Sequence, residues 1–167
     1  MKFLEKDLEQ IIWEADKEVL SEKGLHLDGK LKRQLKIGNY GIADLIHFKR
    51  PEYRLIDNKR RFVENGLIEI IELKNEKISI SAFMQAINYV QGIKRYLEKR
   101  NFREYRYDYT YRITLIGRHL DKNSSICYLP DLICSSEFQV EIYTYNYDLN
   151  GIQFTNESNY KLAKEGF

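Results

Sequence analysis

The sequence predicts one α/β domain over residues 1–167, in which a central mixed β-sheet of about four or five strands is flanked by two long helices. Two stretches, residues 4–19 and 79–100, carry apolar residues at helical spacing. Between them, residues 67–74 are apolar at both alternating positions, which is typical of an interior strand covered on both faces. A chain of this length buries a substantial core without metal or disulfide staples.

Composition narrows the class of protein. Nine Gly and two Pro in the chain leave little room for a flexible linker. No run approaches the ~18 apolar residues of a membrane helix, and residues 1–7 lack the apolar core of a signal peptide. Two cysteines, Cys127 and Cys134, are too few for a disulfide scaffold or a zinc site. We therefore expect a cytoplasmic protein without a membrane partner, and the sequence leaves open whether it forms a homo-oligomer.

The first half of the chain predicts a helix followed by strands. The apolar stripe of the helix consists of Leu4, Leu8, Ile11, Ile12, Ala15 and Val19. After a polar stretch, residues 31–37 and 42–48 predict two half-buried strands joined by a Gly-containing turn at residues 38–41. The basic connection that follows is expected to form an exposed hairpin before the strand at residues 67–74.

The second half begins with a long helix. Ser79 or Ser81 is suited to cap it, and it is expected to run to about Arg100. Its predicted buried stripe consists of Phe83, Ala86, Ile87, Val90, Ile93 and Leu97. Further strands are predicted at residues 105–116, 126–129, 139–147 and 151–155.

Basic residues gather in two segments, although the net charge is only +2. Residues 94–112 contain Lys94, Arg95, Lys99, Arg100, Arg103, Arg106 and Arg112 against Glu98, Glu104 and Asp108. Residues 49–61 contain Lys49, Arg50, Arg54, Lys59, Arg60 and Arg61 against Glu52 and Asp57. Local excesses of positive charge suit a nucleic acid, because each neutralised phosphate releases condensed counterions. A solvated helix end and an exposed hairpin explain the two clusters equally well.

Tyrosines recur at alternate positions in two predicted strands. The first row is Tyr105, Tyr107, Tyr109 and Tyr111, and the second is Tyr143, Tyr145 and Tyr147. Aromatic rows with basic neighbours are able to stack nucleic-acid bases. We favour the alternative for the first row, an amphipathic strand whose tyrosine face continues into Ile113 and Leu115 and packs under a helix.

Glu72 is the most unusual residue of the chain, because it interrupts the most apolar strand. An unpaired carboxylate there costs several kcal/mol. Glu72 and Lys74 share one face of the strand, and an ion pair at a strand end is an alternative explanation. Asp44 also interrupts an apolar strand, after a turn that places it near a strand end. Two carboxylates brought together in a sheet repel each other unless a proton or cation joins them, and Mg²⁺ prefers such oxygen ligands.

The helices supply further polar candidates. Glu5 lies roughly 70° and Glu9 roughly 110° from the centre of the first apolar stripe, so Glu5 is expected closer to whatever that stripe packs against. Gln85 and Tyr89 lie one turn apart on a common flank of the second helix, off its buried stripe. The histidines His26, His47 and His119 are scattered without ligand spacing, which disfavours a histidine-based metal site.

Four segments of the chain, taken in order, resemble the PD-(D/E)XK nuclease superfamily. They are Glu5-Lys6-Asp7-Leu8-Glu9, Gly41-Ile42-Ala43-Asp44-Leu45, Glu72-Leu73-Lys74 and Gln85-Ala86-Ile87-Asn88-Tyr89. Within it, they are similar to the nuclease domain of NucS-type endonucleases. The resemblance implies a restriction-endonuclease-like core with the order helix, three strands, helix, strand. Ala43 departs from the proline of the superfamily name, and the segment between Asp44 and Glu72 is long.

The resemblance also implies a function, a Mg²⁺-dependent endonuclease that hydrolyses DNA phosphodiester bonds, with Mn²⁺ as an alternative ion. Asp44, Glu72, the carbonyl of Leu73 and Glu5 would bind the metal, with Glu9 as the alternative helix carboxylate. Lys74 would orient or activate the attacking water, and Gln85 would act in the same catalytic set. Tyr89, Arg33, Lys94 and Arg95 would contact the substrate. The alternative is a catalytically inactive nuclease-fold module that binds nucleic acid or a protein partner.

Overall fold

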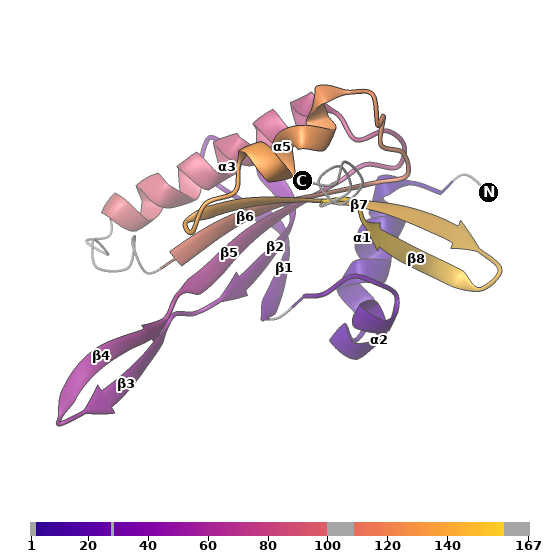
Figure 1. Cartoon of the computed structure of the whole chain (residues 1–167). Coiled ribbons are helices and arrows are strands. Elements are labelled where there is room, and N and C mark those ends of the chain that lie inside the picture. Colours follow the sequence, from indigo (N-terminus) through magenta and orange to yellow (C-terminus); the bar gives the residue numbers. More distant parts are fainter. Residues whose placement is uncertain (1–2, 28, 100–108, 159–167) are drawn as a thin grey trace.

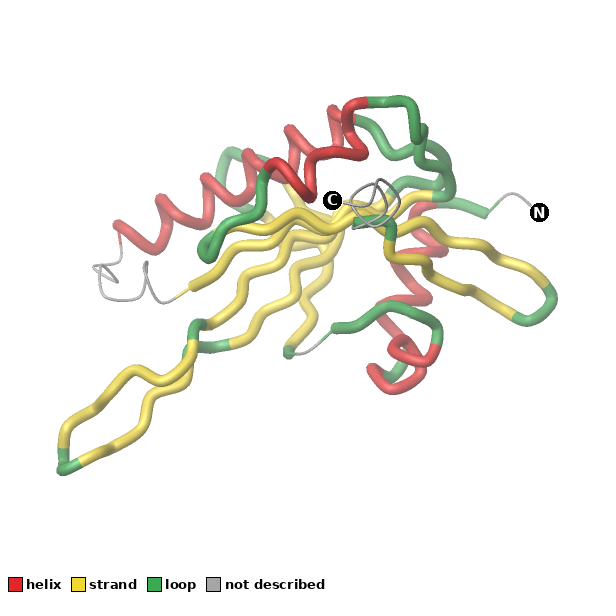
Figure 2. The backbone as a smooth tube through the Cα atoms, viewed as in Figure 1, coloured by secondary structure: helices red, strands yellow, loops and turns green. Residues whose placement is uncertain are grey.

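The computed structural model of the chain describes residues 3–27, 29–99 and 109–158. A six-stranded mixed sheet forms its centre, with strand order β1-β2-β5-β6-β7-β8. The strands are β1 Lys30–Lys36, β2 Ile42–Lys49, β5 Gly66–Leu73, β6 Tyr109–Gly117, β7 Phe138–Asp148 and β8 Gly151–Asn156. The mixed sheet is confirmed, but it has more strands than the four or five expected, because both C-terminal strands join it. Figure 2 shows these strands running side by side through the molecule.

The sheet is parallel in its middle and antiparallel toward both edges. β1, β2 and β5 pair antiparallel, β5, β6 and β7 pair parallel, and β8 returns antiparallel to β7. The parallel crossover from β5 to β6 contains the long helix α3, Ile80–Lys99. β5 lies between β2 and β6, which confirms the interior strand predicted from its apolar pattern.

Helices cover both faces of the sheet (Figure 1). α3 buries one face, where Phe83 packs in a core with Ile70 and Ile113. The opposite face packs against α1, Glu5–Glu14, and its core includes Leu8 and Leu45. Because successive side chains of a strand point to opposite faces, the sheet contributes to two separate cores, one on each side. In the described part of the chain, no helix combines the length and apolar character needed to cross a membrane.

The basic connection after β2 forms the expected hairpin. β3, Glu52–Ile56, and β4, Lys59–Glu64, make a separate two-stranded ribbon that projects from the end of the sheet (Figure 1). All six residues of β4 are exposed.

Two predicted elements are wrong. The first helix ends at Glu14, because Ala15 is extended (ψ 141°) and Asp16 becomes the N-cap of α2, Lys17–Glu22. The predicted strand at residues 126–129 is instead a 3₁₀ turn, Ser125–Tyr128, followed by the short helix α5, Leu129–Leu132. Ser124 caps this turn and Pro130 lies in the first turn of α5, two helix-start signals that outweigh the apolar pattern.

The tyrosine rows are mostly structural. Tyr111 is 2% exposed and packs with Ile113 and Leu115 in the core beneath α3, as the packing alternative predicted. Tyr143 and Tyr145 are likewise buried, whereas Tyr147 is exposed. Other residues of the first tyrosine row and of the basic segment 94–112, namely Tyr105, Tyr107, Arg100, Arg103 and Arg106, lie outside the described residues.

Candidate active site

Two acidic residues from neighbouring strands meet where the β2–β5 ladder ends. Its last pair is Leu45 with Ile71, so Asp44 and Glu72 are the next residues on the two strands. Asp44 Oδ2 accepts a hydrogen bond of 3.1 Å from the backbone N–H of Leu73. Strand pairing thus brings together the two carboxylates that the sequence singled out.

Glu72 carries the main electrostatic anomaly of the site. It is 2% exposed, and its Oε1 atom has no hydrogen-bond partner among the described residues. Burial, assisted by the negative charge of Asp44, raises the pKa of Glu72 to about 8, although Lys74 acts in the opposite direction. Burial also raises the pKa of Asp44. Two desolvated carboxylates of this kind need a proton or a cation between them.

Lys74 supplies the positive charge that acts on both carboxylates. It follows β5 directly, and its backbone N–H donates to the carbonyl oxygen of Ile116 at 2.8 Å. Its Nζ lies 4.0 Å from Glu5 Oε2 on α1, and both side chains are partly exposed, at 27% and 45%. Besides its contact with Glu5, the positive charge of Lys74 acts to lower the pKa of both Asp44 and Glu72.

Glu9 is more buried than Glu5, which is the reverse of the order expected from the helical wheel. Glu9 is only 5% exposed. Its carboxylate binds Arg33 and accepts a hydrogen bond of 2.6 Å from Gln34 Nε2. The wheel measured distance from the apolar stripe, but polar side chains of β1 pack against this flank and bury Glu9 there.

Gln34 is itself strained. Its φ of 50° lies in the left-handed region that favours glycine. The β1–β2 ladder pairs Arg33 with Leu45 and Leu35 with Ala43 in one continuous register, so Gln34 lies opposite Asp44. Backbone strain of this kind is found preferentially at functional sites.

Tyr89 and Gln85 hold the start of β2. The Tyr89 hydroxyl accepts a hydrogen bond of 2.6 Å from Gln85 Nε2 and donates one of 2.9 Å to the carbonyl oxygen of Ile42. Tyr89 is 2% exposed, so its predicted place on an unburied flank is wrong. Gly41 explains the burial, because a Cβ there would lie 3.0 Å from the Tyr89 ring. The pair therefore positions the backbone two residues before Asp44.

The cations predicted to contact substrate have different surroundings. Arg33 is occupied by Glu9 and by Gln10, whose Oε1 lies 2.7 Å from Arg33 Nη1. Lys94 Nζ lies over the Tyr111 ring, 4.7 Å from its centre. Arg95 Nη1 donates to the Tyr40 hydroxyl at 2.6 Å, next to the β1–β2 turn. Arg33 is paired with Leu45, next to Asp44, but its guanidinium is bound by Glu9 and Gln10, whereas Arg95 lies beside the turn that leads into β2.

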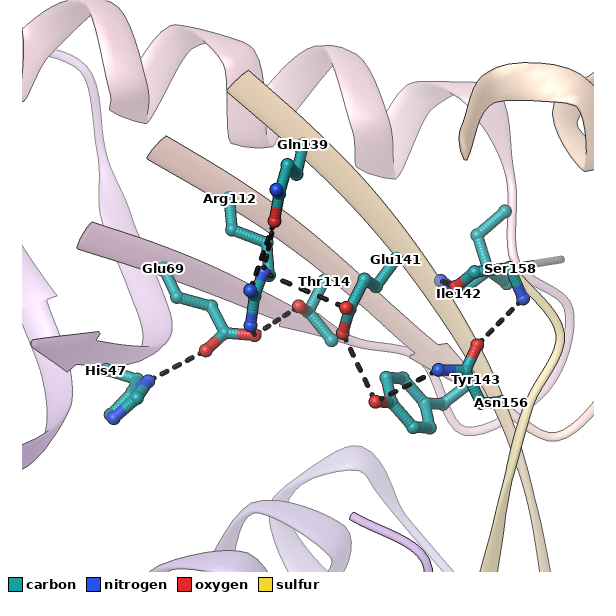
Figure 3. A network of polar contacts seen from close by, with 10 residues as sticks. All are labelled: His47, Glu69, Arg112, Thr114, Gln139, Glu141, Ile142, Tyr143, Asn156 and Ser158. Carbon is teal, nitrogen blue, oxygen red and sulfur yellow. Dashed lines mark hydrogen bonds and ion pairs between the residues drawn. The ribbon is translucent and has the colours of Figure 1, made fainter. Parts of the chain in front are cut away.

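A second buried polar cluster was missed by the sequence reasoning (Figure 3). His47 Nδ1 lies 2.7 Å from Glu69 Oε2, and Thr114 Oγ1 donates to Glu69 Oε1. Arg112 lies 4.0 Å from Glu69 and 3.8 Å from Glu141. The one available signal was Glu69 itself, a second carboxylate inside the apolar run of residues 67–74.

The oxygen atoms gathered where the β2–β5 ladder ends are of the type that binds a hard cation. In the described part of the chain, no three His, Cys, Asp or Glu side chains are grouped to hold a metal ion. Mg²⁺, however, is usually bound through only one or two carboxylates and keeps several waters. Asp44, Glu72 and the Leu73 carbonyl offer oxygen donors, and the unpartnered Glu72 Oε1 lacks the positive partner that an ion would supply.

Comparisons with known proteins identify no family for the chain. No family model matches it, and neither a curated protein nor a solved structure matches it. Its function is therefore inferred from the residues of the site and from the arrangement of the helices and strands.

Proposed function

We propose that the protein is a Mg²⁺-dependent DNA endonuclease with a PD-(D/E)XK-type site. The observation that carries this proposal is the pair Asp44 and Glu72, two desolvated carboxylates joined at one strand end with Lys74 beside them. Burial disfavours the charged form of both carboxylates, and Glu72 Oε1 also lacks a hydrogen-bond partner among the described residues, which favours a functional role for the pair.

The order of elements supports the same proposal. Apart from the short helix α2, α1 is followed by the antiparallel strands β1, β2 and β5, then by α3 and the parallel strand β6. This is the order of helix, three strands, helix and strand that the restriction-endonuclease-like core requires. The β3–β4 ribbon accounts for the long segment between Asp44 and Glu72, and it leaves the pairing of β2 with β5 intact.

Each site residue has a distinct role in the proposed hydrolysis. Asp44, Glu72 and the Leu73 carbonyl would hold Mg²⁺, which when bound supplies positive charge beside the scissile phosphate. Lys74 Nζ would donate hydrogen bonds to the attacking water and to a phosphate oxygen on which negative charge develops. Glu5 would hold Lys74 in place through its ion pair. Tyr89 and Gln85 would fix the backbone that carries Asp44.

Cleavage assays test the proposal directly. We expect the purified protein to cleave plasmid, single-stranded or branched DNA with Mg²⁺ or Mn²⁺ and to lose this activity in EDTA. Lys74→Ala and Asp44→Asn should each lower the rate at least about 100-fold, the usual effect of removing one group that stabilises developing charge.

Lys77→Ala is the matched control. Lys77 lies three residues after Lys74, and its side chain is 62% exposed and pairs with Asp121 at 3.4 Å. It should cleave like the wild type. Cleavage that persists in Lys74→Ala would contradict the mechanism, and no cleavage of any substrate would favour the alternative, an inactive nuclease-fold module that binds nucleic acid or a protein partner.

A further inference from the structure

A groove of about 960 Å³ lies between the β1–β2 turn and the C-terminal half of α3. Its volume falls in the range of ordinary ligand sites. Its wall on the sheet side begins at Lys32 and reaches Tyr40. Tyr40 precedes Gly41, which contacts Tyr89, so the groove leads toward the backbone that carries Asp44.

The groove combines one sign of charge with an apolar floor. Four cations line it, namely Lys32, Lys36, Arg95 and Lys99, and none of its described lining residues is acidic. Leu35, Ile37 and Ile93 also line it. In a chain with 27 basic and 25 acidic side chains, a site with four cations and no carboxylate is a marked local bias.

Two tyrosines complete the lining. Tyr40 is held by Arg95, and Tyr96 on α3 is 55% exposed. Gly92 permits this arrangement, because a Cβ at that position would lie 2.7 Å from the Tyr40 ring and 2.7 Å from Ile37. The tyrosines and apolar side chains form a surface suited to flat aromatic groups, with the cations around it.

We propose that this groove binds a short single-stranded segment of nucleic acid next to the candidate active site. Phosphates would contact the four cations, and a base would stack on Tyr96. A duplex presents phosphates but hides the faces of its bases, so it would leave the aromatic and apolar lining unused. A single strand exposes both groups, and grooves that bind single strands combine basic and aromatic side chains in this way.

The inference rests on the proposed function only for its biological setting, because binding is measurable without cleavage. The experiment measures fluorescence anisotropy of a labelled oligo-dT and of a duplex of equal length, both in EDTA. The wild type should bind the single strand more tightly than the duplex. Lys36→Gln/Lys99→Gln should weaken single-strand binding at least about tenfold and make the slope of log K against log salt shallower by about 1.4, as expected for two lost phosphate contacts.

Tyr96→Leu tests stacking separately from charge. It should weaken binding about fivefold or more without changing the salt slope, because a stacked base contributes ~1–3 kcal/mol. Lys17→Gln/Lys23→Gln is the charge-matched control. Both residues belong to the α2 region, Lys17 in the helix and Lys23 at its C-cap, on the other side of the sheet from α3 (Figure 1). This pair should bind like the wild type.

Equal losses in the two lysine pairs would overturn the inference, as would equal affinity for duplex and single strand. The two proposals fail in different ways. If the groove variants lose binding but the wild type cleaves no DNA, the groove is supported and the nuclease is not. If the wild type cleaves and the groove variants retain both binding and KM, the nuclease is supported and the groove is not.

Discussion

Glu69 and Glu72 lie three residues apart on β5, and both are almost completely buried, at 1% and 2% exposed, yet their surroundings differ. Their odd spacing places them on opposite faces of the strand. Glu69 contacts His47, Thr114 and Arg112 (Figure 3), so its two oxygens are both used. Glu72 Oε1 has no hydrogen-bond partner among the described residues, and its neighbour Asp44 carries the same charge.

The difference points to separate roles for the two carboxylates of this strand. A buried carboxylate with a complete set of partners ties strands together, and losing it leaves those partners unpaired. A buried carboxylate that lacks partners and faces a like charge lowers stability and is retained where function requires it. We therefore propose that Glu69 stabilises the fold and that Glu72 belongs to the candidate site.

The largest expected effect follows from removing Glu69. Glu69→Ala should lower the free energy of unfolding by about 3–5 kcal/mol, because it leaves His47, Thr114 and Arg112 without their buried partner. Urea denaturation measures the change. Glu69→Gln, which retains one acceptor oxygen, should lose less. A loss below about 1 kcal/mol in Glu69→Ala would show that the cluster contributes little to the fold.

Removing the charge of Glu72 should instead raise the free energy of unfolding, by an amount that depends on pH. Its pKa is raised from 4.5 to about 8 in the folded protein. Between these values the folded state binds a proton that the unfolded state has lost, so this contribution to stability falls by about 1.4 kcal/mol per pH unit as pH rises. Glu72→Gln has no such titration. It should be more stable than the wild type, and its advantage should grow by about 2–3 kcal/mol between pH 5.5 and 7.5.

Denaturation of both proteins at the two pH values tests this prediction, since subtracting the variant removes contributions from other groups. A constant difference would mean that Glu72 titrates alike in the folded and unfolded states. Burial of the Glu72 side chain would then not raise its pKa in the folded protein.

A divalent ion bound at the candidate site of Asp44 and Glu72 should stabilise the folded protein. Mg²⁺ at ten times its Kd should raise the free energy of unfolding by about 1.4 kcal/mol, because it binds only the folded state. Asp44→Asn should weaken or abolish this response and raise the metal-free Tm by relieving the repulsion between carboxylates. Thermal melts with and without Mg²⁺ check both effects. A full Mg²⁺ response in Asp44→Asn would exclude Asp44 as a ligand.

The sequence was informative where one strand or helix carries its own pattern. The apolar run of β5 predicted an interior strand and identified Glu72, and the helical period predicted α3. The sequence failed where a residue depends on distant partners. Glu69 is bound by residues of β2 and β6, and no local period indicates that Thr114 or Arg112 will face it.

Tyr89 and Glu9 show the same limit in the site. Tyr89 is buried because Gly41 on another element leaves room for its ring. Glu9 is buried because Arg33 and Gln34 of β1 reach it. A helical wheel measures only distance from the apolar stripe, so it misses burial among polar side chains.

The smallest expected effect ranks the two helix carboxylates. Glu5→Gln should reduce the Mg²⁺ response of the Tm more than Glu9→Gln, by a difference below about 1 kcal/mol, because surface charges contribute little. The structure gives a different reason for this ranking than the helical wheel did. Glu9 is bound by Arg33 and Gln34, whereas Glu5 lies beside Lys74 and raises the pKa of Glu72. Glu9→Gln should instead lower stability with and without metal. Glu14→Gln, on the same helix, serves as the control. A larger loss of the Mg²⁺ response in Glu9→Gln would make Glu9 the helix carboxylate of the site, with the ion displacing Arg33.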